Sequence, residues 1–190
     1  MCVLKDAPPA EPALQSRDHR AHEFTVSLPP WAIVTPERRA HVERVAALLS
    51  AWAMVMVTPE AERARWLRAA WLHDALRDAP AADDLAHGPM AAERAAHDGE
   101  TDQGVLNAVR YHSLGFAGWD AVGRMLYLAD YLEPGRPFDQ DMRRSLAARV
   151  PEDRDAVLKQ VAARRVARVI EGRWPLVRET VDFWNSLVGY

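Results

Sequence analysis

The sequence predicts an all-α domain behind an irregular N-terminal tail. Apolar residues recur at helical spacing over most of the chain, and helix start signals recur between these periodic segments. No stretch shows a sustained two-residue alternation of apolar and polar residues, which a half-buried strand would require. The 190 residues contain no internal repeat. We therefore expect a tail at residues 1–34 and one helical domain at residues 35–190.

The expected tail is interrupted by prolines and develops no apolar face before Phe24. Residues 1–22 carry scattered charges and no apolar run, which is unlike a signal peptide. The longest apolar stretch, residues 46–57, is far shorter than the roughly 20 residues of a membrane span. We therefore expect no membrane partner and a cytoplasmic protein. Some apolar side chains could pack an extended segment onto the domain: Phe24, Val26, Leu28, Trp31 and Ile33.

The helices of the domain are expected in the following order. Thr35-Pro36-Glu37 starts the first, which runs through Trp52. Thr58-Pro59-Glu60 starts the second, which continues through Leu76 and stops at Asp78-Ala79-Pro80. The later helices are expected from His87 to Gly99, from Thr101 or Asp102 to about Gly115, from Asp120 to Pro134, from Asp139 to Arg149, from Pro151 to Gly172 and from Pro175 to about Leu187.

The composition restricts the kind of site that the chain can build. With 24 basic and 27 acidic residues, the net charge of −3 argues against a dedicated binder of duplex nucleic acid, which usually has a basic face. The single cysteine, Cys2, excludes a disulfide framework and any all-cysteine zinc or iron–sulfur site. Any metal must therefore be held by imidazoles and carboxylates.

Two aspartates fall on apolar helical faces. Asp74 lies seven residues after Leu67 and three after Trp71, which places it on the buried stripe of its predicted helix. Asp130 lies within residues 122–132, which are apolar nearly all round. Burying an unpaired carboxylate is costly in free energy, so a shared divalent cation is the simplest compensator for both.

Two histidines complete a candidate metal site. His41 aligns with Val45 and Trp52 on the first helix, and His73 directly precedes Asp74. With Asp74 and Asp130, these histidines offer two nitrogen and two carboxylate ligands, a set that suits iron, manganese, cobalt, magnesium or zinc. A lone histidine on an apolar face is more often a hydrogen-bonded core residue, and Asp130 alone could pair with an arginine. The combination is a stronger signal than any of its members.

These residues resemble the HD-domain metal-dependent phosphohydrolase superfamily, and two segments resemble its YqeK-type branch. The segments are AVRYHSLG at 108–115 and LYLADYLEPGR at 126–136, and the likeness extends from about Arg38 to the C-terminus. Members of that branch are symmetrical bis(5′-nucleosyl)-tetraphosphatases, which cut diadenosine tetraphosphate into two ADP and use bound iron. The resemblance thus implies an HD-domain helical bundle, a nucleotide substrate and an iron cofactor.

The resemblance also implies roles for individual residues. The metal would be held by His41, His73, Asp74 and Asp130. Asp74, His87 and His112 would be the catalytic residues, and the nucleotide or its phosphates would be held by Arg38, Arg77, His87, His112 and Arg136. His87 and His112 could bind phosphate, protonate the leaving group or complete a second metal site. Trp174, Phe183 and Trp184 are expected in the core or at a contact between two copies, which leaves a homodimer open.

Two departures from the branch leave other functions open. Arg77 stands where the branch usually has a lysine, and the connection from Asp74 to His87, which helps to wall the substrate pocket, is much shorter than usual. A second hypothesis is therefore an HD-type phosphohydrolase of another nucleotide, either a mononucleotide or guanosine polyphosphate. A third is a non-catalytic nucleotide-binding module, which the complete set of four metal ligands disfavours.

Overall fold

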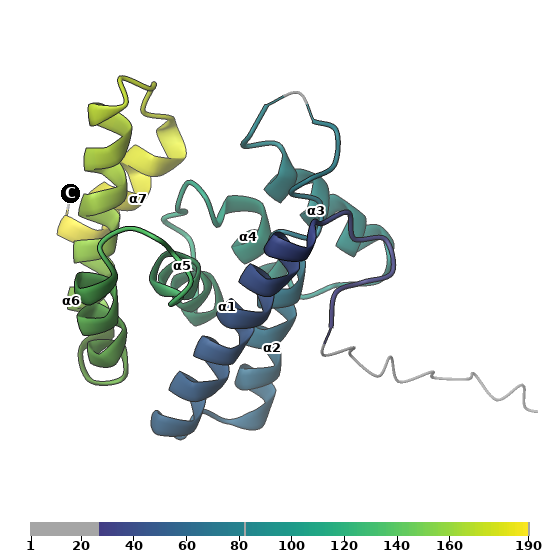
Figure 1. Cartoon of the computed structure of the whole chain (residues 1–190), viewed down its shortest axis with the longest axis horizontal. Helices are drawn as coiled ribbons and strands as arrows, with labels where there is room; N and C mark the ends of the chain where they lie inside the picture. The colour runs from purple at the N-terminus through teal and green to yellow at the C-terminus, as the bar shows by residue number, and fades with distance from the viewer. Residues whose placement is uncertain (1–26, 82, 190) are drawn as a thin grey trace, which may run out of the picture.

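A computed structural model describes residues 27–81 and 83–189, and in this part of the chain it contains helices and no strands (Figure 1). The predicted all-α fold class is confirmed. The helices are Pro36–Val55 (α1), Glu60–Leu72 (α2), His87–His97 (α3), Gln103–Tyr111 (α4), Ala121–Leu132 (α5), Gln140–Glu171 (α6) and Arg178–Val188 (α7). None of these helices is both long and apolar enough to cross a bilayer.

Helix α5 lies at the centre of the domain, where it contacts α1, α2, α4 and α6 (Figure 1). It is central because it is apolar on nearly every face, and a helix of that kind must be covered on all sides. Helices α1 and α2 pack side by side against it, and α6 with α7 cover another side. Asp130 therefore projects from the most buried helix of the fold.

Several helix starts lie where the sequence signals predict them. The Thr35 hydroxyl accepts a hydrogen bond from the backbone N–H of Arg38 at the start of α1. Asp120 caps α5 in the same way, and Asp102 rather than Thr101 caps α4. Each cap satisfies N–H groups that have no partner within the helix.

Three predicted boundaries are wrong. Helix α2 ends at Leu72, so Leu76 lies in a series of turns rather than in the helix. Hydrogen bonds from outside the helix stabilise these turns: the backbone N–H of Ile33 donates to the Ala75 carbonyl (2.7 Å). The two helices expected at 139–149 and 151–172 are present as the two parts of α6, but the kink that separates them is at the non-helical residue Asp153 rather than before Pro151. The last helix begins at Arg178, not at Pro175.

The segment 27–34 packs onto the domain. Leu28 is buried in a small cluster with Val42 and Ala75, and Trp31 packs against the same cluster, as predicted. The side chain of Ile33 is exposed, so the prediction that it packs is wrong. Ile33 contributes to the attachment of the segment through its backbone hydrogen bonds instead. Phe24 and Val26 lie outside the described residues.

Candidate metal centre

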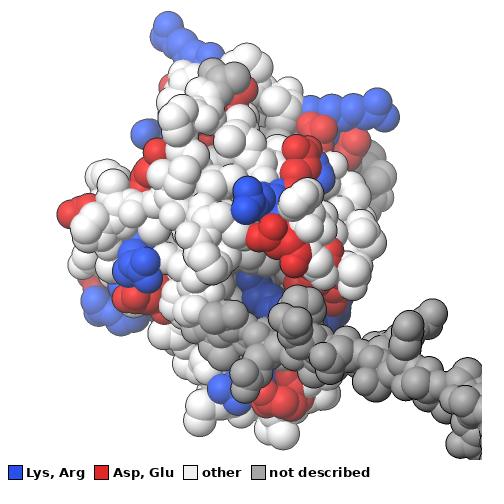
Figure 2. Space-filling view, turned by 90° about the vertical axis from the view of Figure 1, so that its right-hand side faces the viewer, with Lys and Arg blue, Asp and Glu red and all other residues white. Residues whose placement is uncertain are grey.

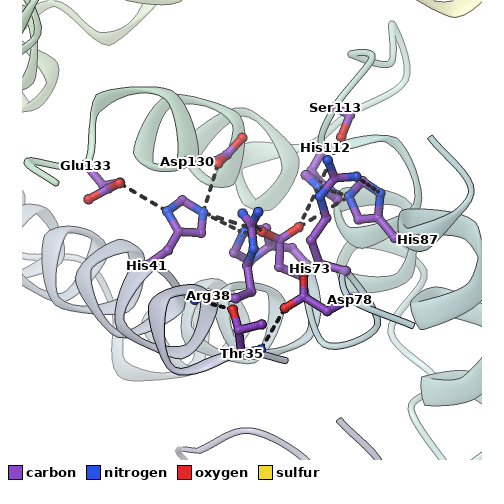
Figure 3. Close-up of polar contacts among 12 residues, drawn as sticks. Thr35, Arg38, His41, His73, Asp78, His87, His112, Ser113, Asp130 and Glu133 are labelled. Atoms are coloured by element: carbon purple, nitrogen blue, oxygen red, sulfur yellow. Dashed lines mark hydrogen bonds and ion pairs between the residues drawn. The ribbon is translucent and has the colours of Figure 1, made fainter. Parts of the chain in front are cut away.

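Six buried histidine and aspartate side chains meet at one place between α1, α2, α3, α4 and α5 (Figure 3). The four metal ligands predicted from the sequence are all among them. His87, the first residue of α3, and His112, just after α4, complete the group; the sequence left their role undecided. The six residues are His41, His73, Asp74, His87, His112 and Asp130.

The six side chains divide into two sets of three. His41, His73 and Asp130 form one set, in which a potential ligand atom of each residue lies within 4.8 Å of the others. Asp74, His87 and His112 form the second set by the same measure. The sequence predicted Asp74 in one site with the first set, and it left open whether His87 and His112 complete a second metal site or act on the phosphate or the leaving group.

Asp74 connects the two sets. Its Oδ2 atom is 3.6 Å from Nε2 of His41 and 3.6 Å from Nε2 of His73. Its Oδ1 atom is 3.3 Å from Nε2 of His87 and 3.4 Å from Nε2 of His112. One carboxylate oxygen therefore faces each set, which is the geometry of a bridging ligand.

The histidines direct their Nε2 atoms into the centre because their Nδ1 atoms are engaged outside it. Three Nδ1 atoms lie 2.6–2.8 Å from backbone carbonyl oxygens, at Ala70 for His73, at Asp84 for His87 and at Val109 for His112. A carbonyl only accepts, so in the neutral imidazole the proton is on Nδ1 and Nε2 carries a lone pair. His41 Nδ1 donates in the same way to Glu133 Oε1 (3.1 Å).

These lone pairs face one another at close range. The Nε2 atoms of His87 and His112 are 3.0 Å apart, and those of His41 and His73 are 3.4 Å apart. Two acceptors at such a distance repel unless a proton or a cation lies near both. Four imidazole nitrogens and two carboxylates thus fit a divalent cation with nitrogen and oxygen ligands.

The environment favours charged aspartates beside a neutral His73 imidazole. Burial lowers the pKa of His73 to about 4. Burial raises the pKa of Asp130, but His41 and two arginines outweigh it and hold the pKa well below its usual range. For His41, burial lowers the pKa, while Asp130 and Glu133 raise it more strongly. Asp130 and Glu133, which draw a proton to His41, would attract a cation in the same way.

Arginines surround the mouth of the centre, a hollow of about 250 Å³ with His87 and His112 in its wall. Arg38 Nη1 donates to Asp74 Oδ2 (2.8 Å), and Arg136 Nη2 donates to Asp130 Oδ1 (2.5 Å). Arg77 also lines this mouth, although its Nη1 atom donates to the Asp84 carbonyl oxygen (2.6 Å). Each predicted phosphate-binding arginine therefore lies at the rim, where guanidinium groups suit phosphate oxygens.

Residues 38–135, which are more than half of the chain, match the HD domain family. This chain belongs to the HD domain family. All six donors of the metal centre lie within the matched part of the HD domain.

Two curated relatives match this chain over a stretch of similar length. A protein of Staphylococcus aureus is 30% identical over 105 residues, which cover 54% of this chain and 53% of that protein. One of Bacillus subtilis is 31% identical over 107 residues, which cover 55% and 56%. Both are named bis(5′-nucleosyl)-tetraphosphatase, symmetrical, and this chain spans about half of their length.

A solved structure supports the fold. It comes from Clostridium acetobutylicum and is described as a predicted HD superfamily hydrolase involved in NAD metabolism. The likeness has a TM-score of 0.69 at 22% identity and covers 82% of this chain and 90% of that one. The helical arrangement of this HD domain is therefore shared with a crystal structure.

Two supporting residues of the HD centre were missed in the sequence. Glu133 is 1% exposed, and besides His41 it binds Arg44 Nε (2.6 Å). Its position three residues after Asp130 could have indicated a shared helical face. Arg165 Nη2 donates to Asp130 Oδ2 (2.7 Å) from α6. It follows the buried Val161 by four residues, so a charged residue on an apolar face was the available signal.

Proposed function

We propose that this HD domain protein is a metal-dependent phosphohydrolase of dinucleoside polyphosphates, which cleaves diadenosine tetraphosphate into two ADP. The observation that carries the proposal is the convergence of four imidazole Nε2 atoms and two carboxylates in one buried centre. The names of the curated relatives support the choice of substrate. The arginine rim supports an anionic substrate.

In this proposal the centre holds two divalent cations. His41, His73 and Asp130 hold one, His87 and His112 hold the other, and Asp74 is shared. Iron is favoured by the resemblance, and manganese, cobalt, magnesium or zinc also suit a nitrogen and oxygen donor set. When bound, such cations supply a water of lowered pKa and offset the charge of the phosphates.

The protein's own groups bind and orient the phosphates. An arginine has five N–H donors, so Arg38 and Arg136 can bind phosphate oxygens while each still contacts its carboxylate. The Ser113 hydroxyl, 3.2 Å from His112 Nε2, lies at the same mouth and offers a further donor. Glu133 keeps His41 in the tautomer that presents Nε2.

A nucleotide is a more suitable ligand for this protein than duplex nucleic acid. On the face shown in Figure 2, basic and acidic side chains are interspersed and do not gather into a basic stripe. Duplex binding usually requires such a stripe. The arginines at the mouth can instead serve a small anion, because they surround a hollow of about 250 Å³.

Hydrolysis of another nucleotide is the second candidate. The observation that favours it is the short connection between Asp74 and His87, since this segment borders the mouth through Asp84 and Leu85. A shorter segment in the wall of the mouth would change which nucleotide is selected, while the metal centre stays intact. A non-catalytic binding module is disfavoured because all six donors are retained.

One experiment separates these candidates. The full chain is loaded anaerobically with Fe²⁺, or with Mn²⁺ or Co²⁺, and incubated separately with diadenosine tetraphosphate, ATP, GTP and guanosine tetraphosphate. Chromatography should show two ADP for each diadenosine tetraphosphate consumed. Release of ATP and AMP would contradict the symmetrical cleavage, and faster turnover of a guanosine nucleotide would favour the second candidate. Absence of turnover with every cation would contradict both.

A further inference from the structure

Two cavities flank the mouth of the metal centre. One, of about 610 Å³, shares Ser113 and Arg165 with the mouth. The other, of about 410 Å³, shares Arg77, Asp84 and His87 with it. The mouth therefore adjoins both cavities, so the two ends of a ligand bound at the mouth can extend into them.

The two cavities differ in chemistry. The larger one is lined by the aromatic rings of Tyr131 and Phe138 and by arginines of α6, among them Arg164 and Arg168. The smaller one is lined by short and acidic side chains besides Arg77 and the buried His87, and the described residues in its wall include no Phe, Tyr or Trp. A nucleobase gains binding energy by stacking on aromatic rings, and its phosphates pair with guanidinium groups. Of these two cavities, the larger offers both; a third cavity shares Arg136 with the mouth, but Trp52 in its wall is buried in the core.

Phe138 is the ring best placed for stacking. Its side chain is 71% exposed, so it adds little to the folded core. The Arg143 guanidinium lies 4.0 Å from the centre of the Tyr131 ring and occupies a face of that ring. Arg143 Nε also donates to the Phe138 carbonyl (2.8 Å), which fixes the backbone that carries the exposed ring. An exposed ring on a fixed backbone suits a planar ligand.

Arg165 connects this cavity to the metal centre. Its Nη2 atom donates to Asp130 Oδ2 (2.7 Å), and its guanidinium lies 4.3 Å from the centre of the Tyr127 ring and 5.4 Å from that of Tyr131. It is therefore fixed from three sides between the centre and the larger cavity. A phosphate chain that leaves the centre past Arg165 would lead its nucleoside toward Phe138.

We propose that the larger cavity is a purine nucleoside subsite in which the base stacks on Phe138, and that the smaller cavity holds the other end of the substrate without stacking. The proposal rests on the proposed function and deepens it. It makes selectivity unequal at the two ends: one end is held by stacking, which favours the larger purine ring, and the other is weakly discriminated.

Binding measurements test the subsite without turnover. The full chain loaded with Mn²⁺ is titrated calorimetrically with ADP and with inorganic pyrophosphate, as wild type, Phe138→Ala and Met54→Ala. Met54 is the matched control because it is 72% exposed at the end of α1 and lines neither cavity. Phe138→Ala should weaken ADP by about tenfold, within the range of base–aromatic stacking, and leave pyrophosphate unchanged. Met54→Ala should change neither.

The outcomes separate the two proposals. Equal ADP affinity in wild type and Phe138→Ala would overturn the subsite, as would wild-type protein that binds pyrophosphate as tightly as ADP. ADP binding that depends on Phe138, in a protein that does not cleave diadenosine tetraphosphate, would overturn the proposed function alone. Cleavage with an unchanged KM in Phe138→Ala would overturn the subsite alone.

Mixed dinucleotides test the inequality of the two ends. The KM values of diadenosine, adenosine–uridine and diuridine tetraphosphates are compared on the wild-type enzyme. The adenosine–uridine compound should lie within about threefold of the diadenosine compound, and the diuridine compound about tenfold higher, since only one end stacks. Equally poor binding of both uridine compounds would show that both ends require a purine and would overturn the inequality.

Discussion

Two clusters of charged side chains in this protein illustrate opposite uses of charge. In the first, which we call the Arg65 cluster, Arg65 and Arg68 of α2 bind four carboxylates: Glu62 of α2 itself, and Glu100, Asp102 and Asp120 around the starts of α4 and α5. Arg65 alone makes ion pairs of 2.7 Å with three of them. The second cluster is the metal centre, where imidazole lone pairs and carboxylates face one another.

The difference shows which cluster is structural. Carboxylates of both clusters have guanidinium partners, but the Arg65 cluster contains no imidazole, and its Asp102 and Asp120 also cap helices, so that cluster is complete as it stands. In the metal centre, imidazole nitrogens are brought within 3.0–3.4 Å of one another, which is unfavourable unless a proton or a cation lies near both. A cluster in which every charged group has a partner stabilises the packing of helices, whereas a cluster of facing hydrogen-bond acceptors indicates a bound ligand.

The largest expected effect distinguishes the two clusters directly. Asp74→Asn should lower hydrolysis of diadenosine tetraphosphate by roughly 10³-fold or more, because it removes the carboxylate charge shared by both donor sets. The metal content of the purified protein should fall with it, as measured by elemental analysis. The free energy of unfolding of the metal-free protein should also fall, because Arg38 loses its buried carboxylate partner.

Asp102→Asn is the matched control in the Arg65 cluster. It makes the same chemical change at an aspartate that no donor set includes, so both metal content and turnover should be retained. Wild-type metal content and turnover in Asp74→Asn would show that the convergent side chains are not a metal site.

A smaller effect is expected from the residue that supports His41. Glu133→Gln keeps the shape of the side chain but removes the charge that accepts from His41 Nδ1 and Arg44. Loss of such a partner should weaken cation affinity by about 10- to 100-fold, and excess metal should restore turnover. Titration of the metal-free protein with Mn²⁺ measures the affinity. Glu62→Gln, which changes a carboxylate of the Arg65 cluster, should leave it unchanged; equal affinities for both variants would contradict the supporting role of Glu133.

The smallest effect concerns the stability that the Arg65 cluster provides. The hydrogen bond from Arg65 lowers the pKa of Asp102 to about 2, from an ordinary value of 3.8. A carboxyl whose pKa is lower in the folded state stabilises the fold above its unfolded pKa and loses this contribution as the pH falls toward the folded one. Asp102→Asn should therefore lower the free energy of unfolding by about 1 kcal/mol at neutral pH, because asparagine still caps α4 but lacks the charge.

Urea unfolding of the two proteins at several pH values provides the measurement. The difference between wild type and Asp102→Asn should be constant above about pH 4 and should shrink between about pH 4 and pH 2. A difference that does not change over this interval would show that the charge of Asp102 contributes nothing to stability.

The sequence predicts the burial of the metal ligands but not their local structure. Helical spacing placed Asp74 on the buried stripe of α2, and Asp74 is buried; yet it lies in the turn after Leu72. That turn depends on contacts between distant segments, including the bond of Ile33 to Ala75, and spacing along one helix cannot reveal them. The division of six donors into two sets likewise depends on how α3 and α4 pack against α2.

The supporting residues were harder to predict for a related reason. Glu133 and Arg165 are charged residues that look solvent-facing when each is read alone. Their burial follows from the approach of α1 and α6 to α5, which brings Arg44 and His41 to Glu133, and Asp130 to Arg165. Helix caps depend on neighbouring residues only: Asp120 was predicted correctly, and Asp102 was one of the two caps expected for α4.

The short segment before α1 has a consequence for where the chain can be cut. Ile33 binds the backbone of Ala75, the residue directly after Asp74, and the backbone N–H of Thr35 donates to Asp78 Oδ2 (2.7 Å). A truncation after residue 34, where the tail was expected to end, would keep every metal donor but would remove the hydrogen bond of Ile33 to Ala75. Residues 27–34, which the sequence assigns to the tail, thus stabilise the turn that carries His73 and Asp74.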